Sequence, residues 1–217
     1  MRMQAAEANR TDPAPSRSYR SPRRAKQAEE TRAAVLEAAT RLFAERGWAA
    51  TGMRDIATEA GVATETVYSH FSSKTGLLQQ AIDIAVVGDD AAVAMVERPE
   101  FAAMGLGSRA QRIAMAAALT ADVHARTGRF ARVLREAAPT DESIAQLLRS
   151  TRERQRLDIA AGAELLMDRP PTVLELDVLW ATLSPEMYLL LVEDSAWTLE
   201  QYRAWVEQIL EHQVPLS

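Results

Sequence analysis

Residues 51–74 read TGMRDIATEAGVATETVYSHFSSK, and this stretch decides the fold of the N-terminal part of the chain. Ile56 and Ala60 lie on one apolar helical face. Gly61 then supplies the left-handed backbone that a tight turn between two helices requires. Val67 resumes the apolar face of a second helix. The stretch therefore predicts a helix-turn-helix.

The second helix of this pair carries mainly polar side chains, as a helix that enters a DNA groove requires. We expect Thr64, Glu65 and Thr66 to contact bases. A threonine offers a hydroxyl and a methyl group, and a carboxylate can accept a hydrogen bond from cytosine N4. The pattern thus indicates duplex DNA as a partner.

Three further residues around the motif are candidates for contacts to the DNA backbone. Lys74 stands at the start of the next helix, where free backbone N–H groups already favour an anion. Thr51 is expected to cap the first helix of the pair and to donate to a phosphate. Arg54 is expected to reach a phosphate or a guanine edge; the alternative is a solvated surface arginine. Ser73 is a predicted N-cap.

A longer helix is predicted upstream, from Gln27 to Arg46. Gly47 reads as its left-handed terminator, and Trp48 is placed to pack back onto Phe43. Residues 1–26 are poor in large apolar groups and rich in arginine, so we expect a disordered basic arm. Within it Arg23 and Arg24 are candidates to follow the DNA backbone; the alternative is a solvated tail without a role.

Composition limits the class of protein. The chain has 217 residues, no cysteine and only three histidines, which disfavours disulfides, thiol catalysis and metal sites. No Gly-rich phosphate loop is present, so an enzyme is not expected, and we predict no cofactor and no metal. No apolar run approaches a membrane span and the N-terminus lacks a signal-peptide core. A cytoplasmic protein without a membrane partner is expected.

Charge is unevenly distributed along the chain. Residues 1–80 hold 12 Lys and Arg against 9 Asp and Glu, whereas residues 81–217 hold 13 against 21. A mildly basic head on an acidic body fits a molecule that meets phosphate at one end only. A run of arginines, Arg149 to Arg156, is interleaved with acidic residues and is interpreted as a solvated helix face.

The rest of the chain predicts helices without strands. The expected segments are 108–126, 129–137, 141–168, 172–195 with a kink at Pro185, and 198–212. Pro99 is expected to break a helix, with a loop at Gly105 and Gly107. The fold class is therefore all-α: a disordered arm at 1–26, a three-helix helix-turn-helix DNA-binding head at 27–75, and a helical body at 76–217.

Residues 32–78 resemble the DNA-binding head of the TetR family of bacterial transcription regulators. The matching positions include Leu42-Phe43, Gly47-Trp48, Asp55-Ile56-Ala57, Ala60-Gly61-Val62, Thr66, Val67-Tyr68, His70-Phe71, Ser73-Lys74 and Leu77-Leu78. The resemblance implies that Tyr68 and His70 contact phosphates. Two positions depart from it. Ala63 replaces a frequent serine cap, so Thr64 is expected to take over the cap, and Glu65 replaces a small residue.

The resemblance also implies a homodimer, a roughly palindromic operator and a small-molecule effector held in the C-terminal body. The candidates for lining an effector pocket are Met104, Met115, His124, Phe130, Met167, Trp180 and Tyr188. The candidates for the dimer interface, in the last two long helices, are Leu183, Met187, Leu190, Leu191, Trp197, Tyr202, Trp205 and Ile209. For both sets, an ordinary intramolecular core is the alternative.

The expected function is a transcriptional repressor that its effector releases from DNA. A regulator or chromosome-structuring protein without small-molecule control would carry the same head, and an activator is a further alternative. A sealed body would favour the first of these rivals, whereas an apolar hollow of a few hundred cubic ångströms would favour a ligand sensor.

Overall fold

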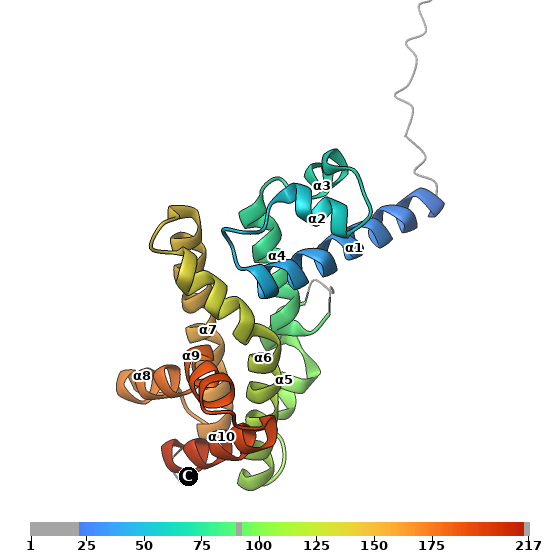
Figure 1. The fold of residues 1–217 in the computed structure, drawn as a ribbon. Coiled ribbons are helices and arrows are strands. Elements are labelled where there is room, and N and C mark those ends of the chain that lie inside the picture. The colour runs from blue at the N-terminus through green and yellow to red at the C-terminus, as the bar shows by residue number, and fades with distance from the viewer. Residues whose placement is uncertain (1–21, 90–92, 215–217) are drawn as a thin grey trace, which may run out of the picture.

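The computed structural model describes residues 22–89 and 93–214, and this part of the chain is helical without strands (Figure 1). The predicted all-α fold is confirmed. The head comprises α1 (Pro22–Arg46), α2 (Met53–Glu59), α3 (Thr64–His70) and α4 (Lys74–Val87). The body comprises η1 (Met95–Glu97), α5 (Pro99–Ala103), α6 (Arg109–Ala137), α7 (Glu142–Met167), α8 (Val173–Thr182), α9 (Pro185–Tyr188), η2 (Leu189–Asp194) and α10 (Leu199–Gln213).

Helix α1 begins at Pro22, five residues before the predicted start. Arg23, Arg24 and Lys26 therefore lie in the first turns of a helix, which corrects their assignment to a disordered arm. The remainder of the predicted arm, residues 1–21, lies outside the described residues. At its other end α1 stops at Gly47, whose φ of 75° is left-handed as predicted.

The segment after α1 packs as expected, but its hydrogen bonds differ from the prediction. Trp48 stacks on Phe43 with ring centroids 5.8 Å apart. Thr51 does not cap α2: its hydroxyl donates to the carbonyls of Leu42 and Gly47 at 3.1 and 2.9 Å. The N-cap is Gly52.

The turn between α2 and α3 follows the prediction at Gly61 and differs at the helix start. Gly61 has φ of 67°, and the N–H of Val62 reaches back to the carbonyl of Ala57 at 3.0 Å. Helix α3 begins at Thr64 with Ala63 as its N-cap, so Thr64 does not take over the cap. Ser73 caps α4 as predicted, accepting a hydrogen bond from the N–H of Gly76 at 3.0 Å.

In the connection from head to body, Pro99 does not break a helix, contrary to the prediction. Helix α4 already ends at Gly88, which adopts a left-handed φ of 90°. Pro99 then starts a short helix, because proline at the first helical position loses no intrahelical hydrogen bond. The loop expected near Gly105 and Gly107 follows this short helix.

Two predicted breaks in the body are wrong. Helix α6 runs without interruption through Gly128, which was expected to separate two helices. Gly128 lies against the ring of Tyr188, and a Cβ there would approach Tyr188 Cδ1 to 2.8 Å. Pro185 does not kink one long helix but starts α9 after a break at Leu183–Ser184. A π-helical turn, η2, then follows α9 directly.

The head and the body share a hydrophobic cluster. Ile56 and Val67 of the helix-turn-helix and Leu78 of α4 belong to the same buried cluster as Phe130 of α6 and Ile144 of α7. A second cluster fills the far end of the body, where α10 packs on α6. Helix α4 is therefore the element through which the head rests on the body. No helix in the described ranges is long and apolar enough to cross a membrane.

Candidate DNA interface and internal cavity

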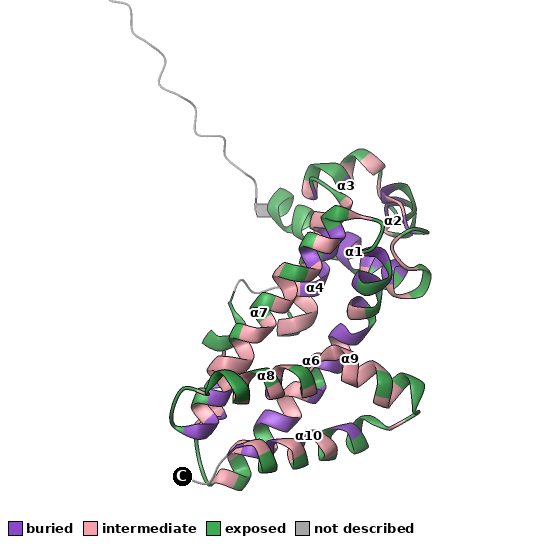
Figure 2. Cartoon of the chain, turned by 90° about the vertical axis from the view of Figure 1, so that its left-hand side faces the viewer, coloured by how far each residue is buried: buried purple, intermediate pink, exposed green. Residues whose placement is uncertain are grey.

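Helix α3 lies at the outer end of the molecule, opposite α10, in both views (Figures 1 and 2). Val67 is its only buried residue, and Phe71 directly after it is also buried, so this apolar side holds the helix onto the head. The outer side carries exposed and half-buried residues (Figure 2). The short helix thus presents one polar face away from the body.

The predicted base-reading residues keep their side chains available. Glu65 is exposed and Thr64 and Thr66 are half-buried. Within the described ranges no hydrogen bond engages the side chain of any of the three. Ser69, by contrast, donates its hydroxyl to the carbonyl of Thr66 at 2.7 Å. These side chains keep their donors and acceptors for another molecule.

The predicted phosphate contacts fall into an exposed group and a group already engaged. Tyr68 is 54% exposed, Arg54 is exposed and His70 is half-buried. Thr51 is 1% exposed and its hydroxyl is used inside the head, so its side chain is not presented at the surface. Arg23 and Arg24 are exposed. Their end of α1 lies on the same side of the head as α3 (Figures 1 and 2).

Lys74 is held against Trp48 at the start of α4. Its Nζ donates to the carbonyl of Trp48 and lies 3.9 Å from the centre of the Trp48 ring. Burial lowers the pKa of Lys74, while Asp141 and Asp55 oppose that shift. Asp141 in turn accepts from the indole N–H of Trp48 at 3.0 Å. The ammonium is therefore fixed in position by ring, carbonyl and nearby carboxylates.

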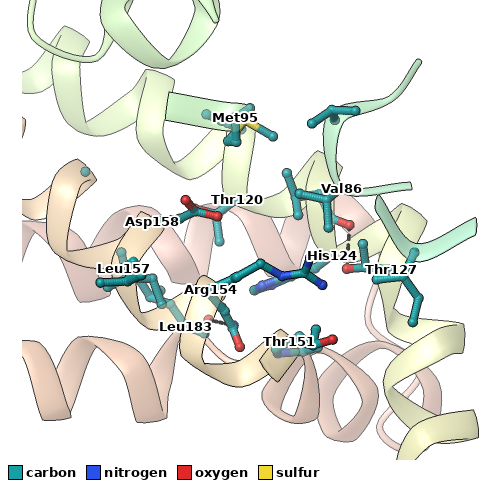
Figure 3. A pocket seen from close by; sticks show the side chains of 18 of the residues that line it. Val86, Met95, Thr120, His124, Thr127, Thr151, Arg154, Leu157, Asp158 and Leu183 are labelled. Atoms are coloured by element: carbon teal, nitrogen blue, oxygen red, sulfur yellow. Dashed lines mark hydrogen bonds between the residues drawn. The ribbon is translucent and has the colours of Figure 1, made fainter. Parts of the chain in front are cut away.

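The body contains a partly open cavity of about 610 Å³ between α4, α6 and α7 (Figure 3). A volume of this size fits a drug-sized molecule. Its walls are mainly apolar and come from both sides of the head–body junction. Polar groups of its lining include Asp83 of α4, His124 of α6, and Arg154 and Asp158 of α7.

Three of the seven predicted pocket residues line this cavity: Met104, His124 and Phe130. The other four, as the structure places them, do not. Met115 is 36% exposed and Met167 is part of the buried core. Trp180 lines a separate small pocket, and Tyr188 packs edge-on against Tyr202 with centroids 5.1 Å apart.

His124 is a buried polar group with a defined partner. It is 4% exposed, and its Nδ1 shares a hydrogen bond of 2.7 Å with the hydroxyl of Tyr202. Desolvation lowers the pKa of His124 to about 4, against a weak opposing effect of Glu186. Burial also raises the pKa of Tyr202. The imidazole is therefore neutral near pH 7.

Sequence reasoning missed the charged residues of the cavity. Arg154 pairs with Asp83 at 3.2 Å, and the neighbouring Arg152 pairs with Glu186 at 2.6 Å. The arginine run interpreted as a solvated face therefore contributes two side chains to the lining. A usable signal was present: Thr151, Arg154 and Asp158 stand at helical spacing and share one face of α7.

The predicted interface residues divide into core and surface. Leu183 and Tyr202 are 6% and 0% exposed, so the core of the body claims both. Met187, Leu191, Trp197, Trp205 and Ile209 are half-buried. Leu190 is 52% exposed, and Val173 and Leu174, which the sequence did not single out, are 75% and 74% exposed. An apolar surface thus remains on α8, η2 and α10.

Groups of three or more histidine, aspartate or glutamate residues suited to a metal ion are absent from residues 22–89 and 93–214. The described site features are a polar helix face and a partly open, mainly apolar cavity with charged groups in its lining.

A helix-turn-helix whose second helix faces outward is an arrangement that DNA-binding proteins use. The family profile of bacterial regulatory proteins of the tetR family matches residues 35–81. The head of the chain is therefore similar to the DNA-binding head of the TetR family.

Two curated relatives match a short part of the chain. One is the HTH-type transcriptional repressor Rv3405c of Mycobacterium tuberculosis, 51% identical over 55 residues, which are 25% of this chain and 29% of the relative. The other is the HTH-type transcriptional activator FasR of Mycolicibacterium smegmatis, 44% identical over 64 residues, which are 28% of this chain and 29% of the relative. The match therefore spans less than a third of either relative.

The whole fold has a counterpart among solved structures. A crystal structure from Rhodococcus sp., assigned to the TetR-family transcriptional regulators, superposes with a TM-score of 0.65. It is 19% identical and covers 86% of this chain and 100% of its own. This likeness extends the shared fold through the body.

Proposed function

We propose that the chain is a homodimeric, sequence-specific DNA-binding transcriptional repressor that a small effector releases from its operator. The observation that carries the proposal is α3, on which Glu65 is exposed and Thr64 and Thr66 are half-buried, none of them with a side-chain hydrogen bond within residues 22–89 and 93–214. A helix in this setting fits the major groove of duplex DNA.

The surroundings of α3 supply groups for the DNA backbone. Tyr68 and His70 lie on α3 itself, and Arg54 and the ammonium of Lys74 lie on the neighbouring α2 and α4. Arg23 and Arg24 lie in the first turn of α1. Phosphate contacts of this kind provide affinity, and the base contacts provide specificity. We assign Thr51 to the stability of the head instead, because its hydroxyl is bonded internally.

A single head offers α3 alone, seven residues long, for base contacts. Two heads on successive turns of one face of the duplex bind far more strongly, so we propose a two-fold dimer and a roughly palindromic operator. The exposed apolar side chains on α8, η2 and α10 provide the surface for such a dimer, with Leu190 in a central role.

The effector site in this proposal is the cavity of about 610 Å³. Its lining includes Asp83 of α4, the helix that carries the head. Arg126 of α6 also donates to the carbonyls of Ala85 and Val86 at 2.8 and 3.1 Å, in the last turn of α4. A ligand that favours another position of α4 would shift the spacing of two heads in a dimer.

The rival function is a DNA-binding regulator without small-molecule control. A sealed, fully packed body would favour it, whereas the hollow body supports the ligand-responsive alternative. The two relatives are a repressor and an activator, so they favour neither role. We propose repression, with activation as the alternative.

Selection of bound fragments from a random DNA pool, using the full chain, tests the proposal directly. We expect an inverted repeat with half-sites about one helical turn apart. Sedimentation of the chain with the selected duplex should give two subunits per site. Recovery of unrelated sequences, or of one unrepeated half-site by a monomer, would contradict the proposal.

A further inference from the structure

The lining of the cavity holds more carboxylate groups than guanidinium groups. Arg154 pairs with Asp83 at 3.2 Å, and Asp158 lies within electrostatic reach of the same guanidinium. Among the described residues, no hydrogen bond or ion pair reaches the Asp158 carboxylate. Two carboxylates therefore share one arginine. Partial burial raises the pKa of both, and the Asp83 side chain is 46% exposed.

The other charged groups of the lining are engaged elsewhere. Arg152 pairs with Glu186 at 2.6 Å. Asp89 is held by Arg98 through two hydrogen bonds of 2.7 Å. Arg32 belongs to the head end of the cavity, where it donates to Gln80. The neutral imidazole of His124 adds no positive charge. The negative charge of the Asp158 carboxylate therefore remains without a cation of its own.

The walls around this carboxylate suit an apolar or aromatic body. Phe101 and Phe130 are 6% and 1% exposed, and both line the cavity. The face of an aromatic ring attracts a cation, most strongly where water is excluded. Figure 3 draws Arg154, Asp158, Thr120 and His124 together in the lining of the cavity. A ligand there meets a carboxylate within an apolar shell.

We propose that the cavity takes an amphipathic organic cation, with an apolar or aromatic body and a single positive centre that lies between Asp158 and Asp83. The inference rests on the effector site of the proposed function and names the chemical class of its ligand. A bound cation supplies the second positive charge that Asp83 and Asp158 need, because the guanidinium of Arg154 neutralises only one of the two carboxylates.

The same geometry connects the ligand to the head. A positive centre beside Asp83 competes with Arg154 for that carboxylate. The pair joins α4 to α7, so its loss removes one of the ties that hold α4 in place. Binding of the cation is thereby linked to the position of the helix that carries the head.

The test uses two ions of nearly equal size and shape, tetraphenylphosphonium and tetraphenylborate, with binding to the full chain measured by calorimetry. We expect the phosphonium to bind at least tenfold more tightly than the borate. Asp158→Asn should weaken phosphonium binding at least tenfold. Arg154→Gln should strengthen it, because that change removes the competing cation. Glu153→Gln, an exposed carboxylate of the same helix, should have no effect.

Tighter binding of the borate, no binding of either ion, or an unchanged phosphonium affinity in Asp158→Asn would overturn the inference. Circular dichroism and melting curves establish that each variant is folded. Operator binding by the ligand-free chain is measured in parallel. If the chain binds an inverted repeat but prefers the borate, the proposed function stands and only the proposal of a cationic ligand is contradicted. A chain that binds the phosphonium but no operator loses the proposed function.

Discussion

At the scale of single residues, α3 and Lys74 divide the proposed work between specificity and affinity. Glu65 extends from the outer face of α3 without a partner of its own, whereas Lys74 is already fixed against Trp48. A fixed ammonium loses less side-chain entropy on meeting a phosphate than a free lysine does. The two residues should therefore respond differently to substitution.

Lys74→Ala should weaken binding to all DNA sequences and reduce the slope of log affinity against log salt by about one phosphate contact. Glu65→Gln should instead change the preferred base at one position of each half-site. Fluorescence anisotropy over a salt series, on the selected operator and on random duplex, measures both effects. A uniform loss of affinity in both variants would contradict this division of roles.

His124 makes the stability of the body depend on pH. Its pKa is about 4 in the folded chain and 6.5 ordinarily, so the unfolded chain binds the proton more readily. Its contribution is complete above 6.5 and is lost as the pH falls through this interval. At 1.36 kcal/mol per pKa unit, the loss between pH 7 and pH 5 is about 2 kcal/mol.

Urea denaturation of the chain and of His124→Gln at the two pH values measures this loss. The variant serves as the control, because carboxylates such as Asp83 titrate in both proteins and cancel in the difference. The free energy of unfolding should fall more steeply in the unchanged chain. Equal pH dependence in the two proteins would show that His124 is not the responsible group.

At the scale of helices, the low helix propensity of glycine and the packing around it have opposite effects on stability. Gly128 in α6 and Gly162 in α7 both lie inside long helices, where alanine is favoured over glycine by about 1 kcal/mol. Packing separates the two positions. A Cβ at Gly128 would approach Tyr188 Cδ1 to 2.8 Å, whereas a Cβ at Gly162 would meet Met104 Cε at an ordinary 3.6 Å.

Gly162→Ala should therefore stabilise the chain by about 0.5–1 kcal/mol. Gly128→Ala should destabilise it by about 1–3 kcal/mol, because the added methyl group displaces the half-buried ring of Tyr188. Thermal and urea unfolding of the two variants gives the comparison. A stabilised Gly128→Ala would mean that Tyr188 moves aside without cost.

At the scale of the whole molecule, exposed apolar side chains on α8 and η2 are candidates for the proposed dimer interface. Val173, Leu174 and Leu190 are 75%, 74% and 52% exposed. In the proposed dimer a second copy covers this surface. The half-buried Trp205 and Ile209 lie on α10 within the same region.

Leu190→Asp should shift the chain from dimer to monomer in analytical ultracentrifugation, because it places a charge in an apolar interface. Leu106→Asp changes a leucine that is 69% exposed on the loop before α6, and it should leave the dimer intact. Melting curves distinguish dissociation from unfolding. A dimer that survives Leu190→Asp would place the interface elsewhere.

The sequence by itself determined the head. Gly47 and Gly61 have left-handed backbones because each follows a helix that must stop and turn sharply. The apolar residues on either side recur at helical spacing, which predicts a helix and not a strand. The cap at Ser73 and the stack of Trp48 on Phe43 are also local, within a few residues of chain. Interactions of such short range are readable without knowledge of the rest of the fold.

The tertiary structure alone decided the continuity of α6, the cavity and the use of the charged residues. Gly128 lies inside a helix with its missing side chain leaving space for Tyr188, sixty residues away in sequence. Thr51 turns inward because Leu42 of α1 and Gly47 after it present carbonyls to its hydroxyl. Asp83 and Arg154 meet only when α4 packs on α7. Such pairings depend on distances across the fold, and helical periodicity carries no information about them.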